Sequence, residues 1–396
     1  MKHYNYIIIG AGIAGTNGAI SIRKEAPEAS IVLIGEEQYP VYSRVNIGKV
    51  ASDAKSPEDL LLKTEEQFQA QNIERIITRV ENLNSQNKTI TLDNGEILAY
   101  DKVLVATGGR ARRLSQVGSD LKGVFAFQTL DDAIGVRDYI RDKNKITIVG
   151  GGFIGIEFVE LLSNLGKEVT LIIRDEWYWQ GMIDQIGGNI INEYLAKRAK
   201  IYYESEIKEI RGNQIGEISE IELNSGEIIP TEAMCVGIGL ELNKDFLPSE
   251  LCNRCLKVNQ YLQSGDENIF GAGDIVEYYD ILQEQYIGSG TWAQASLQGM
   301  IAGYNMVHTE AMKEFSLIPA YCPKTSLAIA FVGQCRLNPE TMQSIVIEQG
   351  DRYVQVNTNA DGKIIGGVVI GDSAYMGTIR KWIVEKLKLD EIITQA

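Results

Sequence analysis

The stretches Tyr6-Ile-Ile-Ile-Gly-Ala-Gly-Ile-Ala-Gly15 and Ile146-Thr-Ile-Val-Gly-Gly-Gly-Phe-Ile-Gly155 decide the fold, because they are one pattern written twice. Each is a short β-branched apolar run, then G-x-G-x-x-G, then a segment whose apolar residues have helical spacing. The first copy predicts a helix over 16–24 and a strand over 31–34. The second predicts a helix over 156–165, ended by Gly166, and a strand over 169–173. The sequence therefore predicts two βαβ openings.

Both copies have the form of a dinucleotide-binding fingerprint. The first glycine makes a tight turn, the second lets the backbone approach a pyrophosphate, and the third lets the helix pack on the strand. The helix N-terminus then faces the phosphates. An ordinary α/β turn with incidental glycines is the alternative, and two copies, each between a strand and a helix, argue against it. The predicted phosphate-binding glycines are Gly10, Gly12, Gly15, Gly150, Gly152 and Gly155.

The overall charge is strongly acidic, with 53 Asp and Glu against 38 Lys and Arg and a net charge of −15. This balance argues against a nucleic-acid or anionic-membrane surface. No apolar run approaches the roughly 18 residues that span a bilayer, and the first strand begins too early for a signal peptide to precede it. Five cysteines, an odd number, are not typical of a secreted disulfide framework. We therefore expect a cytoplasmic protein with reduced thiols.

Shorter elements follow each fingerprint. The stretch 89–98 predicts a hairpin that turns at Asp93-Asn-Gly95, and 100–109 predicts a buried strand that ends in Thr-Gly. A short strand over 268–274 ends in Gly-Asp, and a helix is expected over 291–308. From about residue 320 the pattern changes to alternating strands and a closing helix near 377–387, which puts the likeliest domain boundary near residue 313.

Taken in order, these motifs resemble those of the two-dinucleotide-binding-domain flavoprotein reductases, over essentially the whole chain. Within that family the chain looks most like NADH:rubredoxin reductases and the flavin modules of assimilatory nitrite reductases. The resemblance rests on both fingerprints, Ala106-Thr107-Gly108, Val236-Gly-Ile-Gly239, Gly271-Ala-Gly273-Asp274, and the helix with Trp292, Gln298 and Gly299.

The resemblance implies an α/β, glutathione-reductase-like fold with two Rossmann-like dinucleotide-binding domains and a small C-terminal α+β domain. It implies that FAD binds a domain made of residues 1–112 and 240–312, and that NADH or NADPH binds residues 113–239. Residues 313–396 would form the C-terminal domain.

Two acidic positions are candidates for holding the FAD. Glu36 and Glu37 follow the strand over 31–34, where a carboxylate accepts hydrogen bonds from the adenosine ribose, and the sequence does not say which of them does so. The other carboxylate is Asp274, which in the resembled family holds the flavin ribitol. A helix N-cap is the alternative for Asp274, and the two roles can coexist.

The resemblance also implies which residues lie beside the flavin ring. Arg44 and Lys49 match a basic pair next to the isoalloxazine, and Lys49 is the tentative catalytic residue, since a cation there would stabilise the reduced ring. The similar rubredoxin reductases often carry a carboxylate at this place, and a surface lysine is the alternative. Trp292 matches a tryptophan near the flavin. Ala106, Thr107, Gly108, Gly239 and Gly273 complete the predicted contacts.

The choice of nicotinamide coenzyme is left open by the residues after the second fingerprint. Arg174 follows the strand over 169–173 and resembles the guanidinium that meets the 2′-phosphate in NADPH-using relatives. A second basic residue is missing a turn later, and Gly155 in place of alanine favours NADH. The balance leans slightly to NADPH.

Cysteine chemistry at the flavin is not expected. Residues 41–56 hold no cysteine where the family's disulfide reductases carry a redox pair, and none near Ser43, where its NADH oxidases and peroxidases keep a single cysteine. The family's C-terminal catalytic histidine is also missing. Cys252-Asn-Arg-Cys255 lacks the helical context of a redox C-x-x-C motif and a second ligand pair for zinc. We predict neither a redox cysteine, nor an acid–base residue, nor a metal site.

The function implied by the resemblance is transfer of electrons from NAD(P)H through FAD to a small rubredoxin or ferredoxin-like protein. Two rival interpretations are the flavin-reductase component of a nitrite-reductase-like system and a flavin-bound regulatory protein. No nucleic-acid or membrane partner is expected, and a homodimer is one option for the oligomeric state.

Overall fold

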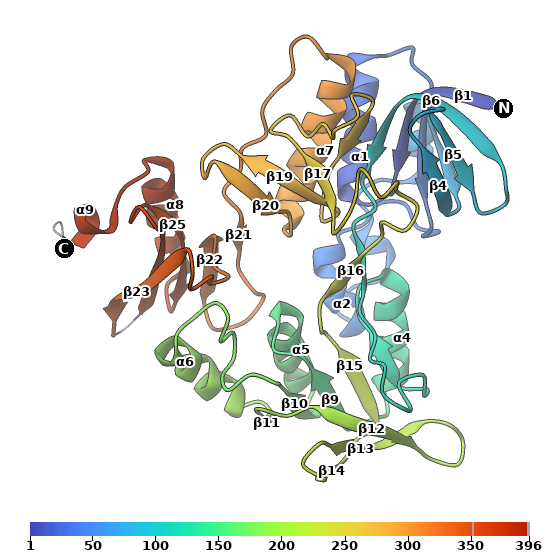
Figure 1. Ribbon diagram of the computed structural model, residues 1–396. Coiled ribbons are helices and arrows are strands. Elements are labelled where there is room, and N and C mark those ends of the chain that lie inside the picture. The colour runs from blue at the N-terminus through green and yellow to red at the C-terminus, as the bar shows by residue number, and fades with distance from the viewer. Residues whose placement is uncertain (351, 394–396) are drawn as a thin grey trace. The chain divides into compact units, whose positions relative to one another are not determined.

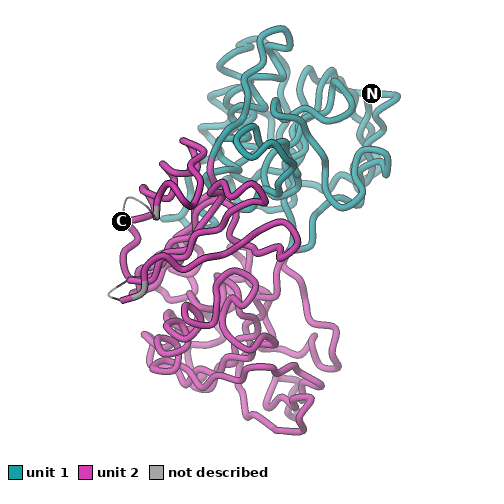
Figure 2. The backbone as a smooth tube through the Cα atoms, turned by 60° about the vertical axis from the view of Figure 1, so that its left-hand side comes forward, with its two compact units in different colours: residues 1–45, 58–110, 241–317 teal, residues 46–57, 111–240, 318–396 magenta. Residues whose placement is uncertain are grey.

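The computed structural model describes residues 1–350 and 352–393. The chain forms two compact units (Figure 2), each of which is built from separated segments. Unit 1 consists of residues 1–45, 58–110 and 241–317, and unit 2 of residues 46–57, 111–240 and 318–396. One division of the chain therefore falls after Leu317, and residues 46–57 group with the central and C-terminal segments. No helix among the described residues is long and apolar enough to cross a membrane.

Unit 1 is organised around a sheet with the strand order β3-β2-β1-β6-β5-β4, in which the C-terminal end of β6 also pairs with β18. Strands β1, β4, β5 and β6 of this sheet are labelled in Figure 1. The strands β3, β2, β1, β6 and β18 are parallel, so their carboxyl ends share one edge. The sheet strands are β1 (Lys2–Ile9), β2 (Ile31–Gly35), β3 (Ile73–Ile77), β4 (Val80–Asn84), β5 (Thr89–Leu92), β6 (Ile97–Val105) and β18 (Ile269–Gly271).

The remaining elements of unit 1 flank this sheet. Helix α1 follows β1 directly and ends just before Pro27, which cannot continue a helix. The helices are α1 (Ile13–Glu25), α3 (Glu65–Ala70) and α7 (Trp292–Val307), with a 3₁₀ turn at Glu58–Leu60. A second, three-stranded sheet contains β17 (Leu256–Val258), β19 (Val276–Asp280) and β20 (Gln285–Gly288). Strands β7 (Gly109–Ala111) and β16 (Leu240–Leu242) form a two-stranded ribbon, and within each of them the chain passes from one unit to the other.

Unit 2 contains a five-stranded parallel sheet with the order β11-β10-β9-β15-β8. Its strands are β8 (Val124–Ala126), β9 (Lys145–Val149), β10 (Glu168–Ile172), β11 (Lys200–Tyr202) and β15 (Ala233–Val236). Its helices are α2 (Gly48–Ala51), α4 (Leu130–Ile140), α5 (Phe153–Asn164) and α6 (Gln185–Ala196). A small antiparallel sheet of β12 (Ile207–Gly212), β13 (Ile218–Leu223) and β14 (Ile228–Pro230) extends it.

The C-terminal segment of unit 2 is an antiparallel sheet with the order β21-β22-β25-β24-β23. Its strands are β21 (Ala320–Tyr321), β22 (Ile329–Gly333), β23 (Met342–Gln349), β24 (Tyr353–Asn359) and β25 (Ile364–Ile370). Helix α8 (Met376–Val384) packs on β22 and β25 through buried Ile379 and Ile383, and α9 (Leu389–Ile393) follows. The predicted α/β class with two βαβ openings is confirmed, and each expected strand and helix lies within a few residues of its observed bounds.

Candidate functional site

The first glycine turn lies between β1 and α1, at the carboxyl edge of the parallel sheet of unit 1. Gly10 has φ +109°, and a Cβ atom there would overlap the carbonyl oxygen of Ala106. A Cβ at Gly15 would overlap the carbonyl oxygen of Gly10, so both positions require glycine. Gly12, the N-cap of α1, faces open space. The turn therefore leaves room beside the helix N-terminus, where backbone N–H groups bind phosphates.

The two acidic candidates after β2 have different surroundings. Glu37 accepts a hydrogen bond of 2.5 Å from the hydroxyl of Tyr42 and forms an ion pair with Arg44. Burial opposes the charge of Arg44, but Glu37 and Tyr42 raise its pKa. Glu36 is exposed, and among the described residues no hydrogen bond or ion pair engages it. Glu36 is thus the carboxylate that stays available to a ribose.

Asp274 follows β18 at the same edge of the sheet. Its carboxylate is partly buried, and none of the described residues donates a hydrogen bond to it. Burial raises its pKa, and the nearby charge of Arg44 offsets part of that effect. Because a partly desolvated carboxylate is stabilised by hydrogen-bond donors, Asp274 is open to donors from outside the protein.

The turn that carries Asp274 is fixed by α7. Gly273 has φ +83°, and its N–H donates to Oε1 of Gln298 at 2.8 Å. The side chain of Gln298 is fully buried, and its Nε2 atom has no hydrogen-bond partner among the described residues. Gln298 thus sets the turn while keeping a free donor.

Helix α7 also packs closely on α1 along a line of small residues. A Cβ at Gly299 would overlap the carbonyl oxygen of Ala14, and a Cβ at Gly303 that of Gly18. Asn17 of α1 donates to the hydroxyl of Ser296 at 2.8 Å. Trp292, the first residue of α7, stays 37% exposed. Gly299 therefore holds the two helices together, and Trp292 keeps a free aromatic surface.

The predicted contacts at the end of β6 are mainly structural. The hydroxyl of Thr107 donates to the carbonyl of Asn243 at 2.8 Å, and the amide of Asn243 donates back at 3.1 Å. Gly108 has φ +58°, and its carbonyl accepts the N–H of Asn243 at 3.0 Å. The side chain of Thr107 therefore joins two distant segments of the chain.

The second glycine turn, in unit 2, repeats the first between β9 and α5. Gly150 has φ +120°, and a Cβ there would overlap the carbonyl oxygen of Gly237. A Cβ at Gly155 would overlap the carbonyl of Gly150 and lie 2.9 Å from the hydroxyl of Tyr178. Gly155 is therefore required by packing, and its identity does not report on the coenzyme. Gly239, predicted from the family, has φ +104° and binds the N–H of Arg112 through its carbonyl.

Arg174 lies beyond the carboxyl end of β10, beside a shallow depression of about 370 Å³. Its side chain is 78% exposed, and its Nε lies 3.8 Å from a carboxylate oxygen of Asp175. The depression is lined by Arg174, Asp175, Glu176, Gln180, Glu204, Glu206 and Asn224. Four carboxylates thus surround one guanidinium.

Lys49 is exposed on α2, in the segment that belongs to unit 2. It lies close enough to Lys324 for their charges to interact, and burial with this repulsion lowers the pKa of Lys324. The Nζ of Lys324 donates to Asn46 at 2.8 Å. Glu157 of α5 accepts bonds from the hydroxyl of Tyr321 (2.7 Å) and the backbone N–H of Lys324 (2.9 Å). The structure thus adds Glu157 and Lys324 to the neighbourhood of Lys49.

Sequence reasoning missed these residues for a physical reason. Glu157 and Tyr321 are separated by 164 residues, and neither belongs to a recognisable motif. Tyr178 lies in the aromatic run Trp177-Tyr178-Trp179, which stands where the sequence lacks a second basic residue. The signal that could have found Glu157 is its position two residues after Gly155, on the helix that opens at the phosphate turn.

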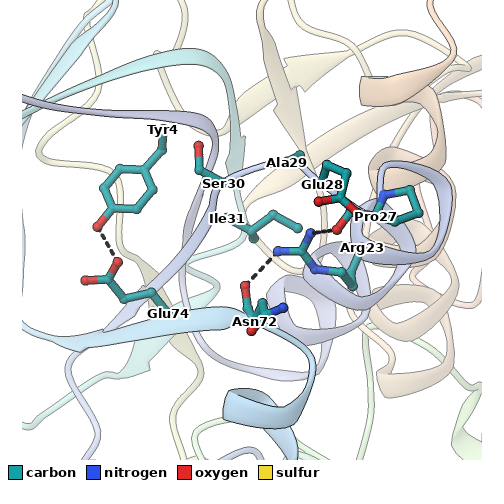
Figure 3. Close-up of a pocket in the computed structure, with 9 residues that line it drawn as sticks. All are labelled: Tyr4, Arg23, Pro27, Glu28, Ala29, Ser30, Ile31, Asn72 and Glu74. Atoms are coloured by element: carbon teal, nitrogen blue, oxygen red, sulfur yellow. Dashed lines mark hydrogen bonds between the residues drawn. The ribbon is translucent and has the colours of Figure 1, made fainter.

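A further depression of about 270 Å³ lies at the opposite end of the parallel strands of unit 1 (Figure 3). Its lining residues include Tyr4 and Glu74, which are hydrogen-bonded to one another at 2.7 Å. Arg23 donates to the backbone carbonyls of Pro27, Gln71 and Asn72. Because these donors already have partners within the protein, their hydrogen bonds stabilise the fold around the depression.

Residues 4–299 match the family described as "Pyridine nucleotide-disulphide oxidoreductase". The chain is 26% identical to an NADH-rubredoxin oxidoreductase of Clostridium acetobutylicum, over 99% of this chain and 97% of that one. It is 26% identical to the ferredoxin–NAD(+) reductase component of a 3-phenylpropionate/cinnamic acid dioxygenase from Photorhabdus laumondii, covering 96% of each. In fold it is similar to putidaredoxin reductase from its covalent complex with putidaredoxin, with a TM-score of 0.89, 19% identity and coverage of 99% of this chain and 96% of that one.

Proposed function

The chain belongs to the pyridine nucleotide-disulphide oxidoreductase family, whose enzymes use flavin and nicotinamide cofactors. We propose that it is an FAD-containing enzyme that oxidises NADH and reduces a small electron-transfer protein. The acceptor would be a rubredoxin or a ferredoxin-like iron–sulfur protein, as in the relatives' names. The observation that carries the proposal is the Gly273-Asp274 turn, where a partly buried carboxylate lacks donors among the described residues.

The flavin site is proposed for residues 1–112 and 240–312, most of which belong to unit 1. Asp274 would accept hydrogen bonds from the ribitol of FAD, and Glu36 would accept those of the adenosine ribose. The open N-terminus of α1 beside Gly12 would bind the pyrophosphate. Glu37 would act indirectly, because it holds Arg44 at this edge of the sheet.

The redox chemistry would be supplied by the cofactors, since a flavin can accept the two electrons of a hydride and pass them on singly. The chain's own residues would bind, orient and supply charge. Within unit 2, Lys49 and its neighbour Lys324 would supply positive charge. We propose no acid–base residue and no thiol relay, since all five cysteines are free and residues 41–56 contain none. The free thiols also favour a cytoplasmic location.

The coenzyme site is proposed for residues 113–239, with NADH preferred over NADPH. This reverses the slight preference for NADPH that Arg174 suggested from sequence. Asp175, Glu176, Glu204 and Glu206 line the same depression as Arg174, and they would repel a 2′-phosphate while accepting hydrogen bonds from a ribose 2′-hydroxyl. One exposed guanidinium cannot balance four carboxylates.

The coenzyme proposal is tested by measuring kcat/KM for NADH and NADPH. We expect the wild type to prefer NADH by at least about tenfold, a difference of about 1.4 kcal/mol. Changing Glu204 and Glu206 together to glutamine should raise kcat/KM for NADPH, because two repelling charges are lost. The value for NADH should change less, because each glutamine keeps an acceptor oxygen for the ribose 2′-hydroxyl. Glu193→Gln removes an exposed carboxylate outside the depression and serves as the control. A wild type that prefers NADPH, or equal effects in both variants, would overturn the assignment.

The function itself is tested by anaerobic mixing with NADH. A reductase must lose its flavin absorbance at the rate of turnover, whereas a flavin-bound regulatory protein would bind the nucleotide without rapid bleaching. Reoxidation by a rubredoxin or a ferredoxin then distinguishes the proposed acceptors.

A further inference from the structure

A hydroxyl group donates a hydrogen bond to a backbone carbonyl in each of the two glycine turns, but the residue that supplies it differs. In the first, Thr16 follows Gly15, and its side-chain hydroxyl donates to the carbonyl of Ala11 inside the turn at 3.3 Å. The corresponding residue of the second turn is Ile156, which is fully buried and has no hydroxyl. The second copy of the fingerprint therefore lacks the polar group that braces the first.

Tyr178 supplies a hydroxyl to the second turn from outside the fingerprint. Its side chain is fully buried, and its hydroxyl donates to the carbonyl of Gly152 at 2.5 Å. Burial keeps the pKa of Tyr178 far above its usual range, so the hydroxyl stays protonated and remains a donor.

The bonded carbonyl belongs to the residue that opens α5. Gly152 is the N-cap of α5, and its carbonyl also accepts the first helical bond, from Ile156 at 3.3 Å. A hydrogen bond to this carbonyl fixes the orientation of the peptide unit between Gly152 and Phe153. The N–H groups of the first helical turn, which bind phosphate in such folds, are thereby held in one direction.

The segment that carries Tyr178 is packed against aromatic side chains of α5 and the C-terminal sheet. It begins at Arg174 and Asp175, which line the acidic depression, and Trp179 follows with φ +60° and a buried indole. The Trp179 ring packs against Phe331 of the C-terminal sheet, with ring centroids 4.8 Å apart, and against Phe153 at 5.4 Å. The C-terminal sheet therefore supports the position of Tyr178.

We propose that Tyr178 is a positioning residue for the nicotinamide coenzyme: its hydroxyl preorganises the phosphate-binding turn and couples it to the segment that meets the adenosine ribose. The inference rests on the proposed function, because it assigns the second turn to NADH. Preorganisation raises affinity by removing the cost of ordering the turn upon binding. It has no effect on the chemical step once the coenzyme is bound.

The test is Tyr178→Phe in the full-length holoenzyme, with the NAD⁺ dissociation constant measured by calorimetry. Loss of one hydrogen bond should weaken NAD⁺ binding about fivefold to tenfold. KM for NADH should rise by a similar factor, while kcat with ferricyanide and the FAD content remain within about twofold of the wild type. Phenylalanine keeps the buried ring, and the melting temperature reports on folding.

Tyr203→Phe is the matched control, because it removes a half-buried hydroxyl of unit 2 that bonds to Asn192 and not to the turn. An unchanged NAD⁺ dissociation constant in Tyr178→Phe would overturn the inference, as would an equal loss in Tyr203→Phe. A fall in kcat at unchanged KM would also overturn it. If the wild-type protein binds no NAD⁺ and its flavin is not reduced by NADH, the proposed function itself fails.

Discussion

Replacing Asp274 by asparagine should weaken FAD binding without weakening the apoprotein. The substitution keeps the shape and one acceptor oxygen of the side chain but removes its charge. In the structure this carboxylate lacks hydrogen-bond donors among the described residues, and only Arg44 opposes the cost of its burial. Arg44 retains Glu37 as a partner after the change. The charge of Asp274 therefore destabilises the apoprotein and stabilises the complex in which hydroxyl groups of FAD donate to it.

The magnitude follows from the strength of charge-assisted hydrogen bonds, about 1.5–3 kcal/mol each. The asparagine side chain would lose the charge assistance and keep an acceptor, so FAD should bind about tenfold more weakly, or ~1.4 kcal/mol. Asp274→Ala removes the acceptor as well and should lose about 100-fold, or ~2.7 kcal/mol. The apoprotein carrying Asp274→Asn should melt at or above the wild-type temperature.

The pH dependence has a definite sign. Because burial raises the pKa of Asp274, the folded apoprotein binds this proton more tightly than the unfolded chain. The wild-type apoprotein should therefore lose stability as pH rises from the ordinary carboxyl pKa through the raised one. This component of the pH profile should vanish in Asp274→Asn.

The assay compares FAD dissociation constants by fluorescence titration with melting temperatures of the apoproteins at several pH values. Asp245→Asn is the control, since Asp245 is an exposed carboxylate of unit 1 near Arg110. FAD affinity that is unchanged in Asp274→Asn, or lowered equally in Asp245→Asn, would refute the ribitol assignment.

Three further predictions follow from contacts in each unit. Gly299→Ala should lower the free energy of unfolding by about 1–3 kcal/mol, because the added methyl group forces α7 away from α1. The melting temperature should fall by about 2–4 °C per kcal/mol. Gly265→Ala, whose Cβ would lie in open space, is the control, and equal melting temperatures in the two variants would contradict the packing argument. Arg174→Glu should lower kcat/KM for NADPH far more than for NADH, because Arg174 is the only cation among the described residues that line the depression. Unchanged NADPH kinetics would show that Arg174 points elsewhere. Turnover with ferricyanide should survive replacement of all five cysteines by serine, and its loss with FAD still bound would restore a thiol relay; the five are Cys235, Cys252, Cys255, Cys322 and Cys335.

The fold could be predicted because its signals are local. Each strand before a glycine turn is a continuous apolar run, and Gly10 and Gly150 have the left-handed backbone that the fingerprint requires. The hairpin turn at Gly95 has φ +82°, as its Asn-Gly sequence indicates. The division of ligands among the domains stays a prediction, and the structure draws its nearest boundary after Leu317 where the sequence suggested residue 313.

The parts of the site that sequence reasoning could not resolve depend on contacts between distant residues. Glu36 and Glu37 are indistinguishable in sequence, and only the ion pair of Glu37 with Arg44 separates them. Thr107 matched a cofactor motif, yet its hydroxyl bonds to Asn243, 136 residues away. Gly155 favours NADH from sequence, whereas its close approach to the carbonyl oxygen of Gly150 explains it by packing.

The central claim is tested most directly by anaerobic stopped-flow spectroscopy of the holoenzyme. Mixing with NADH should bleach the flavin absorbance at a rate at least equal to steady-state turnover, and adding an oxidised rubredoxin should restore it within the same time range. A small disulfide such as glutathione disulfide should restore it far more slowly. Flavin that stays oxidised in NADH, or that a disulfide reoxidises as fast as the rubredoxin does, would contradict the proposed function.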